Sequence, residues 1–245
     1  MKLVIIAAGQ GKRIRSITEE SPKTLLKING RTLLETLFEN CLHVGISDVV
    51  VVTGYQTKEI EGFIHNLGMD LNIQTVYNPN WNLENGMSIL AAKDTIPAHE
   101  TFIVSMSDHF YGPDLLEQVM KINLTNNTAC VALDFNKDDI FDIDDGMKIT
   151  VEKNNKEKIT GMSKILDNFD AVDCGVFKFK YSFFKTLENA RRSGKFSISE
   201  ACQMLIQIGE MGGVNIGNSF WLDIDTPEAL HYLKNTFSCD LQLYI

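Results

Sequence analysis

The chain of 245 residues lacks any uninterrupted apolar segment of about 18 residues, the length that a membrane-spanning helix requires. Met1 and Lys2 lead directly into a short apolar run, without the longer apolar region and small-residue cleavage site of a secretory signal. Cysteine is sparse and never forms a Cys-x-x-Cys pair, a pattern typical of reduced cysteines that pack in a core. The five are Cys41, Cys130, Cys174, Cys202 and Cys239. We therefore expect a cytoplasmic protein without a membrane-inserted segment.

Positive charge is also in short supply. The chain carries 23 lysines and arginines against 32 aspartates and glutamates, a formal net charge of −9. Such a balance provides no basic field to attract nucleic acid or an acidic membrane surface, so neither is an expected partner. A small, metal-chelated anion remains compatible with this charge. The oligomeric state is left open, and a homodimer is among the assemblies that the sequence allows.

Strand-like and helical segments alternate through the first half of the chain. We predict strands at residues 3–7, 49–53, 73–77 and 102–105, and helices at residues 33–43, 58–67, 87–95 and 115–122. This order predicts an α/β fold, a Rossmann-like, mainly parallel sheet with helices on both faces. Ligands of such sheets bind beyond the carboxyl ends of the strands.

The second half changes in character. Short strand-like runs at residues 129–133, 148–152, 159–162 and 172–179 show little helical period and predict an antiparallel extension of the sheet. Helices are predicted at residues 181–191 and 198–208, followed by a strand that ends in Phe220-Trp221 and a helix from about Pro227. The acidic run at residues 138–146 lacks the spacing of a calcium loop and is interpreted as a solvated turn.

A glycine-rich basic loop, Ala7-Ala8-Gly9-Gln10-Gly11-Lys12-Arg13, follows the first strand. Glycines let the backbone approach phosphates and present N–H groups to them. The loop is neither a dinucleotide fingerprint, because Ile14 stands three residues after Gly11, nor a Walker loop. An ordinary turn with surface charges is the alternative. The following Pro22-Lys23 favours a binding role, since proline fixes the chain and hence the direction of the lysine.

Two aspartates are candidate metal ligands. Asp108 stands just beyond the strand at residues 102–105, and Asp225 lies in Trp221-Leu222-Asp223-Ile224-Asp225-Thr226-Pro227. Magnesium prefers one or two carboxylates completed by water and phosphate oxygens. Both aspartates could instead be turn or helix caps. We predict that Asp108 and Asp225 bind Mg²⁺.

These motifs resemble those of the sugar nucleotidyltransferases, whose signature runs Gly-x-Gly-x-Arg, a threonine, here Thr18, and then Pro-Lys-x-Leu, here at residues 22–25. Lys12 and Ser16 depart from the threonine and proline that sugar pyrophosphorylases usually carry there. A closer resemblance covers nearly the whole chain and is to the CTP:inositol-1-phosphate cytidylyltransferases, whose relatives include phosphocholine and phosphonate cytidylyltransferases. The motifs that carry it are residues 84–88, 106–109, 172–175 and 221–227.

The resemblance implies Mg²⁺-dependent transfer of CMP from CTP to a small phosphorylated alcohol, with inositol 1-phosphate giving CDP-inositol and pyrophosphate. Catalytic residues would be Lys23, Arg13 and Lys12. Nucleotide contacts would come from Ala7, Ala8, Gly9, Gly11, Gly54, Asn85, Gly86, Ser88 and Ser107. Acceptor contacts would come from His109, Asp145, Lys148, Asp173, Trp221 and Asp223. A single domain over residues 1–245 would bind the nucleotide with about 1–125 and the acceptor with about 126–220, while 221–245 return the second carboxylate and a helix.

Three alternatives remain at this point. Phosphocholine or a phosphonate is a competing acceptor, and aromatic faces would hold its cationic group. The candidate rings are Trp81, Phe110, Tyr111, Phe141 and Trp221. A UTP- or GTP-dependent enzyme acting on a hexose 1-phosphate is a second alternative. A regulatory protein that binds nucleotide without turnover is the third, and the presence of Lys23 and both aspartates argues against it.

Overall fold

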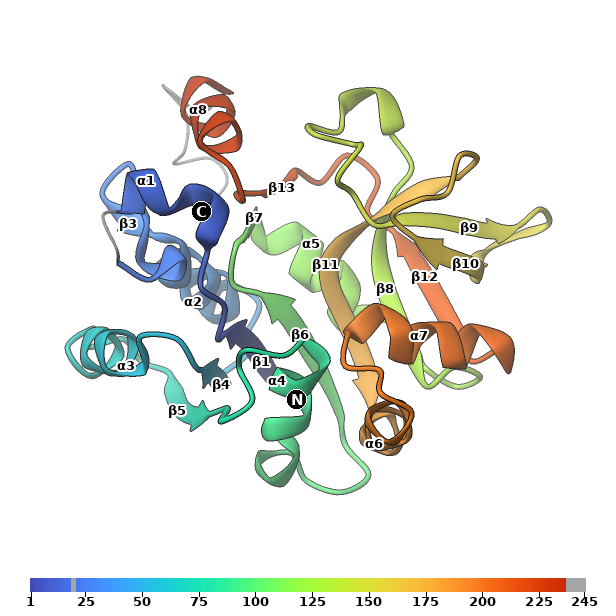
Figure 1. Ribbon diagram of the computed structural model, residues 1–245, viewed down its shortest axis with the longest axis horizontal. Coiled ribbons are helices and arrows are strands. Elements are labelled where there is room, and N and C mark those ends of the chain that lie inside the picture. The colour runs from blue at the N-terminus through green and yellow to red at the C-terminus, as the bar shows by residue number, and fades with distance from the viewer. Residues whose placement is uncertain (19–20, 237–245) are drawn as a thin grey trace.

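A nine-stranded sheet forms the centre of the computed structural model, which describes residues 1–18 and 21–236 (Figure 1). The strand order is β5-β4-β1-β6-β11-β8-β12-β10-β9. The first four strands in this order are parallel and consist of β1 (Lys2–Ala7), β4 (Asp48–Thr53), β5 (Asn72–Tyr77) and β6 (Thr101–Met106). They confirm the parallel half that the alternating sequence predicts.

The antiparallel extension begins with β11 (Ala171–Lys180), which pairs with both β6 and β8 (Ala129–Asp134). β12 (Met211–Asn215) then runs parallel to β8. A hairpin of β9 (Lys148–Glu152) and β10 (Asn155–Ser163) completes this side of the sheet. The predicted fold class is confirmed, and the whole sheet is mixed.

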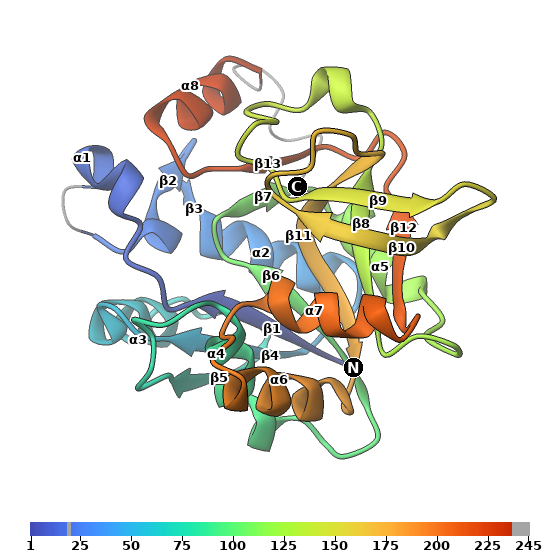
Figure 2. The same ribbon diagram turned by 45° about the vertical axis from the view of Figure 1, so that its right-hand side comes forward.

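Helices cover both faces of the sheet (Figure 2). α2 (Leu33–His43), α3 (Thr57–His65) and α5 (Pro113–Lys121) pack on one face; α4 (Gly86–Ala91), α6 (Phe183–Arg192) and α7 (Ile198–Gln207) pack on the other. Side chains alternate along a strand, so Leu3 and Ile5 of β1 face the first set while Val4 and Ile6 face the second. Burial of apolar surface on both faces explains the continuous apolar runs of these strands.

Short elements build the upper rim of the molecule in Figure 1. β7 (His109–Tyr111) pairs with β13 (Trp221–Asp223), and α8 (Pro227–Thr236) follows. The remaining elements are α1 (Arg15–Thr18), the hairpin of β2 (Lys27–Ile28) and β3 (Arg31–Thr32), and 3₁₀ turns at Lys12–Ile14, Lys23–Leu25, Lys93–Thr95 and Lys137–Asp139. A separate apolar cluster, which includes Ile14, Phe110 and Leu230, joins these elements.

One predicted strand is wrong. The sequence suggests a strand that ends in Phe220-Trp221, but β12 ends at Asn215 and Trp221 begins β13. A turn separates the two strands, because Gly217 has a φ of +61° and its N–H bonds to the side chain of Asn215 at 2.9 Å. β13 ends at Asp223, so Asp225 lies beyond the strand.

The cysteines Cys41, Cys130, Cys174 and Cys202 are buried and unpaired, whereas Cys239 lies outside the described residues. Within the described parts, every helix is too short or too polar to cross a bilayer.

Candidate active site

Two adjoining cavities open at the carboxyl ends of β1 and β6. The smaller, of about 440 Å³, is lined by the glycine-rich loop, by Lys23 and by residues 81–85. The larger, of about 1190 Å³, lies over the antiparallel half and below α8. Both cavities are lined by Asp108 and Asp225, so these carboxylates stand at the junction.

Lys23 lies at the centre of this junction. Its side chain is only 8% exposed, and Nζ lies 3.0 Å from Oδ2 of Asp108. The same ammonium forms an ion pair with Asp225 and lies 3.8 Å from Oδ1 of Asp223. Three carboxylates therefore surround one lysine.

The glycine-rich loop makes room for this lysine. Gly11 has a φ of +57°, and a Cβ at this position would lie 2.9 Å from Cβ of Lys23. Pro22 precedes the 3₁₀ turn that begins at Lys23. A fixed φ at proline and a missing side chain at glycine together set the direction of the lysine.

Arg13 connects the loop to the larger cavity. One guanidinium nitrogen lies 2.6 Å from Asp145, and another pairs with Asp225. Lys164 contacts the second oxygen of Asp145 at 2.9 Å. Hydrogen bonds from Arg13 and Lys164 lower the pKa of Asp145, so this carboxylate is held in its charged form.

Asp108 divides its two oxygens between two partners. Oδ2 faces Lys23, while Oδ1 lies 3.0 Å from Nδ1 of His109. Burial alone would raise the pKa of Asp108, but the charges of Lys23 and His109 outweigh it and hold the pKa well below its usual range. Burial opposes protonation of His109 in turn, yet Asp223 and Asp108 raise the pKa of this histidine.

The donor set at the junction fits a divalent cation. Ligating atoms of Asp108, His109 and Asp223 lie within 4.8 Å of one another. Oδ1 of Asp223 is buried and accepts no hydrogen bond from any described residue, and burial raises the pKa of this carboxyl. The nearest cation to this oxygen is the Lys23 ammonium at 3.8 Å, and a buried carboxylate oxygen that accepts no hydrogen bond is costly unless a further cation or donor joins it. Oxygen ligands of this kind suit a hard metal ion.

This geometry differs from the roles that the sequence suggests for Asp223 and Asp225. Asp223, which the sequence suggests as an acceptor contact, joins Asp108 and His109 in the group of side chains that could hold a metal ion. Asp225, suggested as the second metal ligand, pairs with Arg13 and Lys23. Both aspartates nevertheless lie at the junction, and the assignment of Asp225 to the metal stays a prediction.

Most of the candidate nucleotide contacts line the smaller cavity, namely Ala7, Ala8, Gly9, Gly11, Asn85, Ser88 and Ser107, together with Lys12, Arg13 and Lys23. Gly54 and Gly86 are not among its lining residues. Gly54 packs against Trp81, which lines the smaller cavity, and a Cβ at Gly86 would lie 2.6 Å from the carbonyl oxygen of Phe196, which lines the larger one. The absence of a side chain at these two positions permits this close packing.

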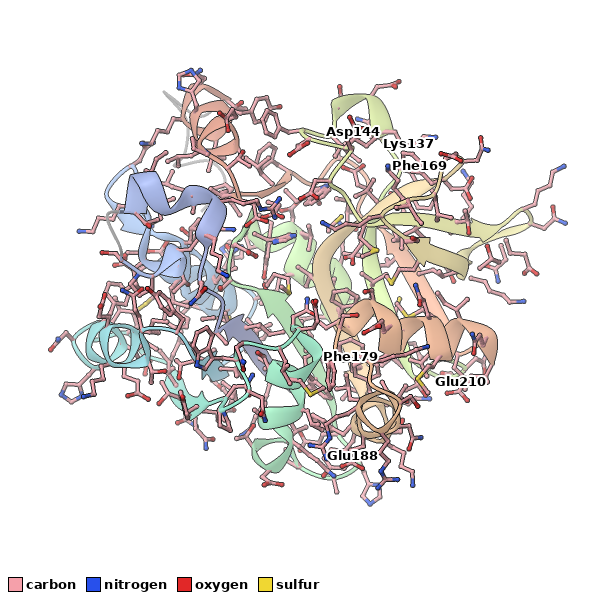
Figure 3. All side chains as sticks on the ribbon, in the orientation of Figure 1. Lys137, Asp144, Phe169, Phe179, Glu188 and Glu210 are labelled. Carbon is pink, nitrogen blue, oxygen red and sulfur yellow. The ribbon has the colours of Figure 1, made fainter. Side chains whose placement is uncertain are left out.

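The candidate acceptor contacts His109, Asp145, Asp173, Trp221 and Asp223 line the larger cavity. Lys148 is not among its lining residues. Its ammonium lies 5.5 Å from the ring centre of Phe169. The ammonium of Lys137 lies 4.9 Å from the centre of the same ring (Figure 3). The acidic run predicted as a solvated turn contributes Asp139, Asp142 and Asp145 to the cavity lining.

Lys164 is the functional candidate that the sequence analysis missed. It is the one lysine of the described residues that lines the larger cavity. The residue directly follows β10, in a segment where several lysines are equally exposed. No local pattern distinguishes it, because the antiparallel pairing of β9 with β10, in which Ser163 stands opposite Lys148, brings it to Asp145.

Comparison with known proteins agrees with this geometry. The sequence profile of the nucleotidyl transferase family matches residues 2–238. A bifunctional IPC transferase and DIPP synthase of Aquifex aeolicus is 31% identical over 234 residues, which cover 94% of this chain and 50% of the relative. A bifunctional protein GlmU of Methanococcus maripaludis is 29% identical over 239 residues, which cover 93% of this chain and 52% of the relative. The chain therefore spans about half the length of these relatives.

Solved structures share the same fold. The inositol-1-phosphate CTP transferase from T. maritima superposes with a TM-score of 0.81 at 21% identity, covering 97% of this chain and 98% of the other. The mixed sheet with helices on both faces defines an α/β protein of this fold. With the profile match across nearly its full length, the chain belongs to the nucleotidyl transferase family.

Proposed function

We propose that this protein transfers CMP from CTP to a small phosphorylated alcohol, with inositol 1-phosphate as the acceptor. The observation that carries this proposal is the meeting of two cavities at Asp108 and Asp225, both of which contact Lys23, a lining residue of the smaller cavity. A triphosphate in the smaller cavity and a phosphorylated acceptor in the larger would bring their reacting phosphates together there. Residues 1–125 would then bind the nucleotide and residues 126–220 the acceptor.

The reaction needs no general base. A phosphate oxygen of the acceptor forms a new bond to the α-phosphorus of CTP, and the bond between the α-phosphorus and its bridging oxygen breaks. Pyrophosphate leaves with the electron pair of that bond, and no proton moves. Charge develops on the α-phosphate and on the leaving group, so fixed cations lower the barrier. We assign this role to the ammonium of Lys23.

The loop residues position the triphosphate. Backbone N–H groups around Gly9 and Gly11 would bind phosphate oxygens, and Lys12 and Arg13 would neutralise their charge. Bound Mg²⁺ would supply Lewis-acid stabilisation of the phosphate oxygens. The carboxylates that would hold it are Asp108, Asp225 and Asp223, whose Oδ1 accepts no hydrogen bond. Ser88 and Asn85 would contact the nucleoside.

A polyol acceptor suits the larger cavity. Asp145, Asp173 and Glu200 are among the carboxylates of its lining, and such groups accept hydrogen bonds from hydroxyls. Lys164 would bind the acceptor phosphate as a point charge. The Aquifex relative, named an IPC transferase, supports the choice of inositol 1-phosphate.

Phosphocholine is a second candidate acceptor. The ring of Phe141 stacks on Tyr232 at 4.8 Å between ring centres, and both line the larger cavity beside its many carboxylates. Aromatic faces with nearby negative charge bind quaternary ammonium groups. Of the five rings that the sequence suggests, Phe141 and Trp221 line this cavity, Trp81 lines the smaller one, and Phe110 and Tyr111 are buried in the core.

Pyrophosphate release measures the proposal directly. Each of four NTPs is combined with inositol 1-phosphate, phosphocholine, aminoethylphosphonate or glucose 1-phosphate in the presence of Mg²⁺. We expect CTP to exceed UTP at least about tenfold in kcat/KM, because a pocket built for the cytosine amine leaves groups unpaired with uracil. Equal use of CTP and UTP, or turnover of glucose 1-phosphate alone, would contradict the proposal.

A further inference from the structure

His109 is held between an aromatic ring and a glycine. Its ring stacks on Trp221 with 6.0 Å between centres and 14° between planes. The indole N–H of Trp221 donates to Oδ2 of Asp134 at 2.8 Å, which fixes the indole. On the other side, Gly175 has a φ of +74°, and a Cβ there would lie 2.5 Å from Cδ2 and Nε2 of His109. These contacts leave the His109 side chain only 11% exposed.

The register of two short strands brings these groups together. In the pairing of β7 with β13, His109 stands opposite Asp223, and Trp221 stands opposite Tyr111. His109 and Trp221 are therefore diagonal neighbours, a separation that aromatic side chains can bridge. Gly175 comes from β11, a strand of the central sheet.

The imidazole nitrogens are both accounted for. Nδ1 lies 3.0 Å from Oδ1 of Asp108, and because an ionised carboxylate only accepts hydrogen bonds, Nδ1 donates. Nε2 faces Gly175. The bond from His109 leaves Oδ2 of Asp108 directed at Lys23 and the junction of the cavities.

We propose that His109 is a positioning residue for Asp108, and that Trp221 and Gly175 clamp the imidazole in the orientation that this task requires. The inference rests on the proposed role of Asp108 in binding a divalent cation. An outer hydrogen bond of this kind fixes the plane of a ligating carboxylate, and its loss typically weakens metal binding 10- to 100-fold, an order-of-magnitude range. The same contacts give a function to Trp221 and Gly175, which line the larger cavity and contact His109.

Binding of Mn²⁺ to the whole chain, measured by calorimetry and by electron paramagnetic resonance in the presence of CTP, tests the clamp. Mn²⁺ accepts the oxygen ligands that Mg²⁺ prefers. We expect His109→Phe, which keeps a ring on Trp221 but lacks the N–H donor, to raise the Kd for Mn²⁺ about 10- to 100-fold. His109→Gln keeps a donor and should recover part of that loss. Pulsed resonance should detect no nitrogen bound to Mn²⁺ in the wild type.

Gly175→Ala provides a second route to the same question, and Gly209→Ala is its matched control. Gly209 has a φ of +72°, close to the +74° of Gly175, but a Cβ there meets no atom within 4 Å. Both substitutions strain the backbone, whereas only the first displaces His109. We expect Gly175→Ala to raise the Kd for Mn²⁺ at least about 10-fold more than Gly209→Ala.

The outcomes separate the inference from the function on which it rests. A wild-type chain that binds no Mn²⁺ would overturn the metal site, and the positioning role with it. Binding by the wild type, with unchanged affinity in folded His109→Phe, would overturn the positioning role alone. Nitrogen coordination in the wild type would do the same, since His109 would then be a ligand. If His109→Phe fails to fold by circular dichroism, equal Mn²⁺ affinity of the two glycine variants decides against the clamp.

Discussion

The ammonium of Lys23 lies 3.0 Å from Oδ2 of Asp108, although 85 positions separate the two residues in the chain. Lys23 follows the glycine-rich loop after β1, and Asp108 follows β6, so the parallel pairing of these neighbouring strands brings the two together. The pair joins the cation and the carboxylate to which we assign roles in the proposed transfer. Its separate parts can be tested by substitution.

Removal of the Lys23 ammonium should impair the chemical step. Lys23→Ala is expected to lower kcat and kcat/KM together by about 10² to 10³, because the charge that this lysine would stabilise develops in the transition state. Lys23→Arg should not rescue fully, since a planar guanidinium cannot replace a compact ammonium. Lys12→Ala, on the same cavity wall, should mainly raise the KM for CTP. A Lys23→Ala enzyme with normal kcat would contradict this role.

Substitution of the carboxylates at the junction of the two cavities should weaken binding of the metal ion. Asp108→Asn, Asp223→Asn and Asp225→Asn are each expected to lower kcat by about 10² or more, because each would remove an oxygen ligand. EDTA should abolish activity and Mg²⁺ should restore it. Titration of Mn²⁺ then ranks the aspartates. A larger loss of Mn²⁺ affinity in Asp225→Asn would support Asp108 and Asp225 as the metal ligands, as the sequence suggests. A larger loss in Asp223→Asn would favour the group of Asp108, His109 and Asp223 that the structure brings together. Asp144→Asn, an exposed change outside both cavities, is the control.

Substitution of Lys164 should weaken binding of the acceptor more than binding of the nucleotide. Lys164→Ala is expected to raise the KM for inositol 1-phosphate about 10-fold or more and to leave the KM for CTP nearly unchanged, because one phosphate contact is lost. Lys158→Ala is a matched control, since Lys158 pairs with Glu152 and is 46% exposed, against 50% for Lys164, but lines neither cavity. Equal kinetics of the two variants would exclude the acceptor role.

Asp173 should make stability depend on pH. Burial raises its pKa from 3.8 to about 6, although the N–H of Gly175 and the facing His109 favour the charged form. The folded state therefore binds this proton more tightly than the unfolded state. With respect to this group, stability is fully present below about pH 3.8 and is lost as the pH rises to about 6.

Asp173→Asn removes this titration while keeping an acceptor for the Gly175 N–H. We expect it to raise the free energy of unfolding at pH 8 by up to about 3 kcal/mol and to change it little at pH 4. Urea unfolding at both pH values measures the difference, with Asp144→Asn as the control. An equal effect of Asp173→Asn at the two pH values would show that its carboxyl titrates normally.

Local patterns explain which elements the sequence could predict. The predicted helix at residues 33–43 has the bounds of α2, because Thr32 and Glu35 form a capping box within one turn. The prediction of a strand that ends at Trp221 was wrong, because the turn at Gly217 depends on a positive φ that a strand-like composition does not reveal. Lys148 was chosen as a polar side chain that could meet acceptor hydroxyls, but the tertiary fold places its ammonium near the ring of Phe169 and leaves it out of the lining of the larger cavity.

The sequence by itself determined the parallel βα half, the glycine-rich loop and the placement of Lys23, because each depends on residues that are adjacent in the chain. Only the tertiary structure decided that Asp223 joins Asp108 and His109, that Lys164 faces the larger cavity, and that Gly175 lies against His109. The contacts of Asp223 and of Gly175 with the segment at Asp108 and His109 join strands that are far apart in the chain. Their geometry is set by strand register and by the packing of whole elements, and neither is written in the spacing of neighbouring residues.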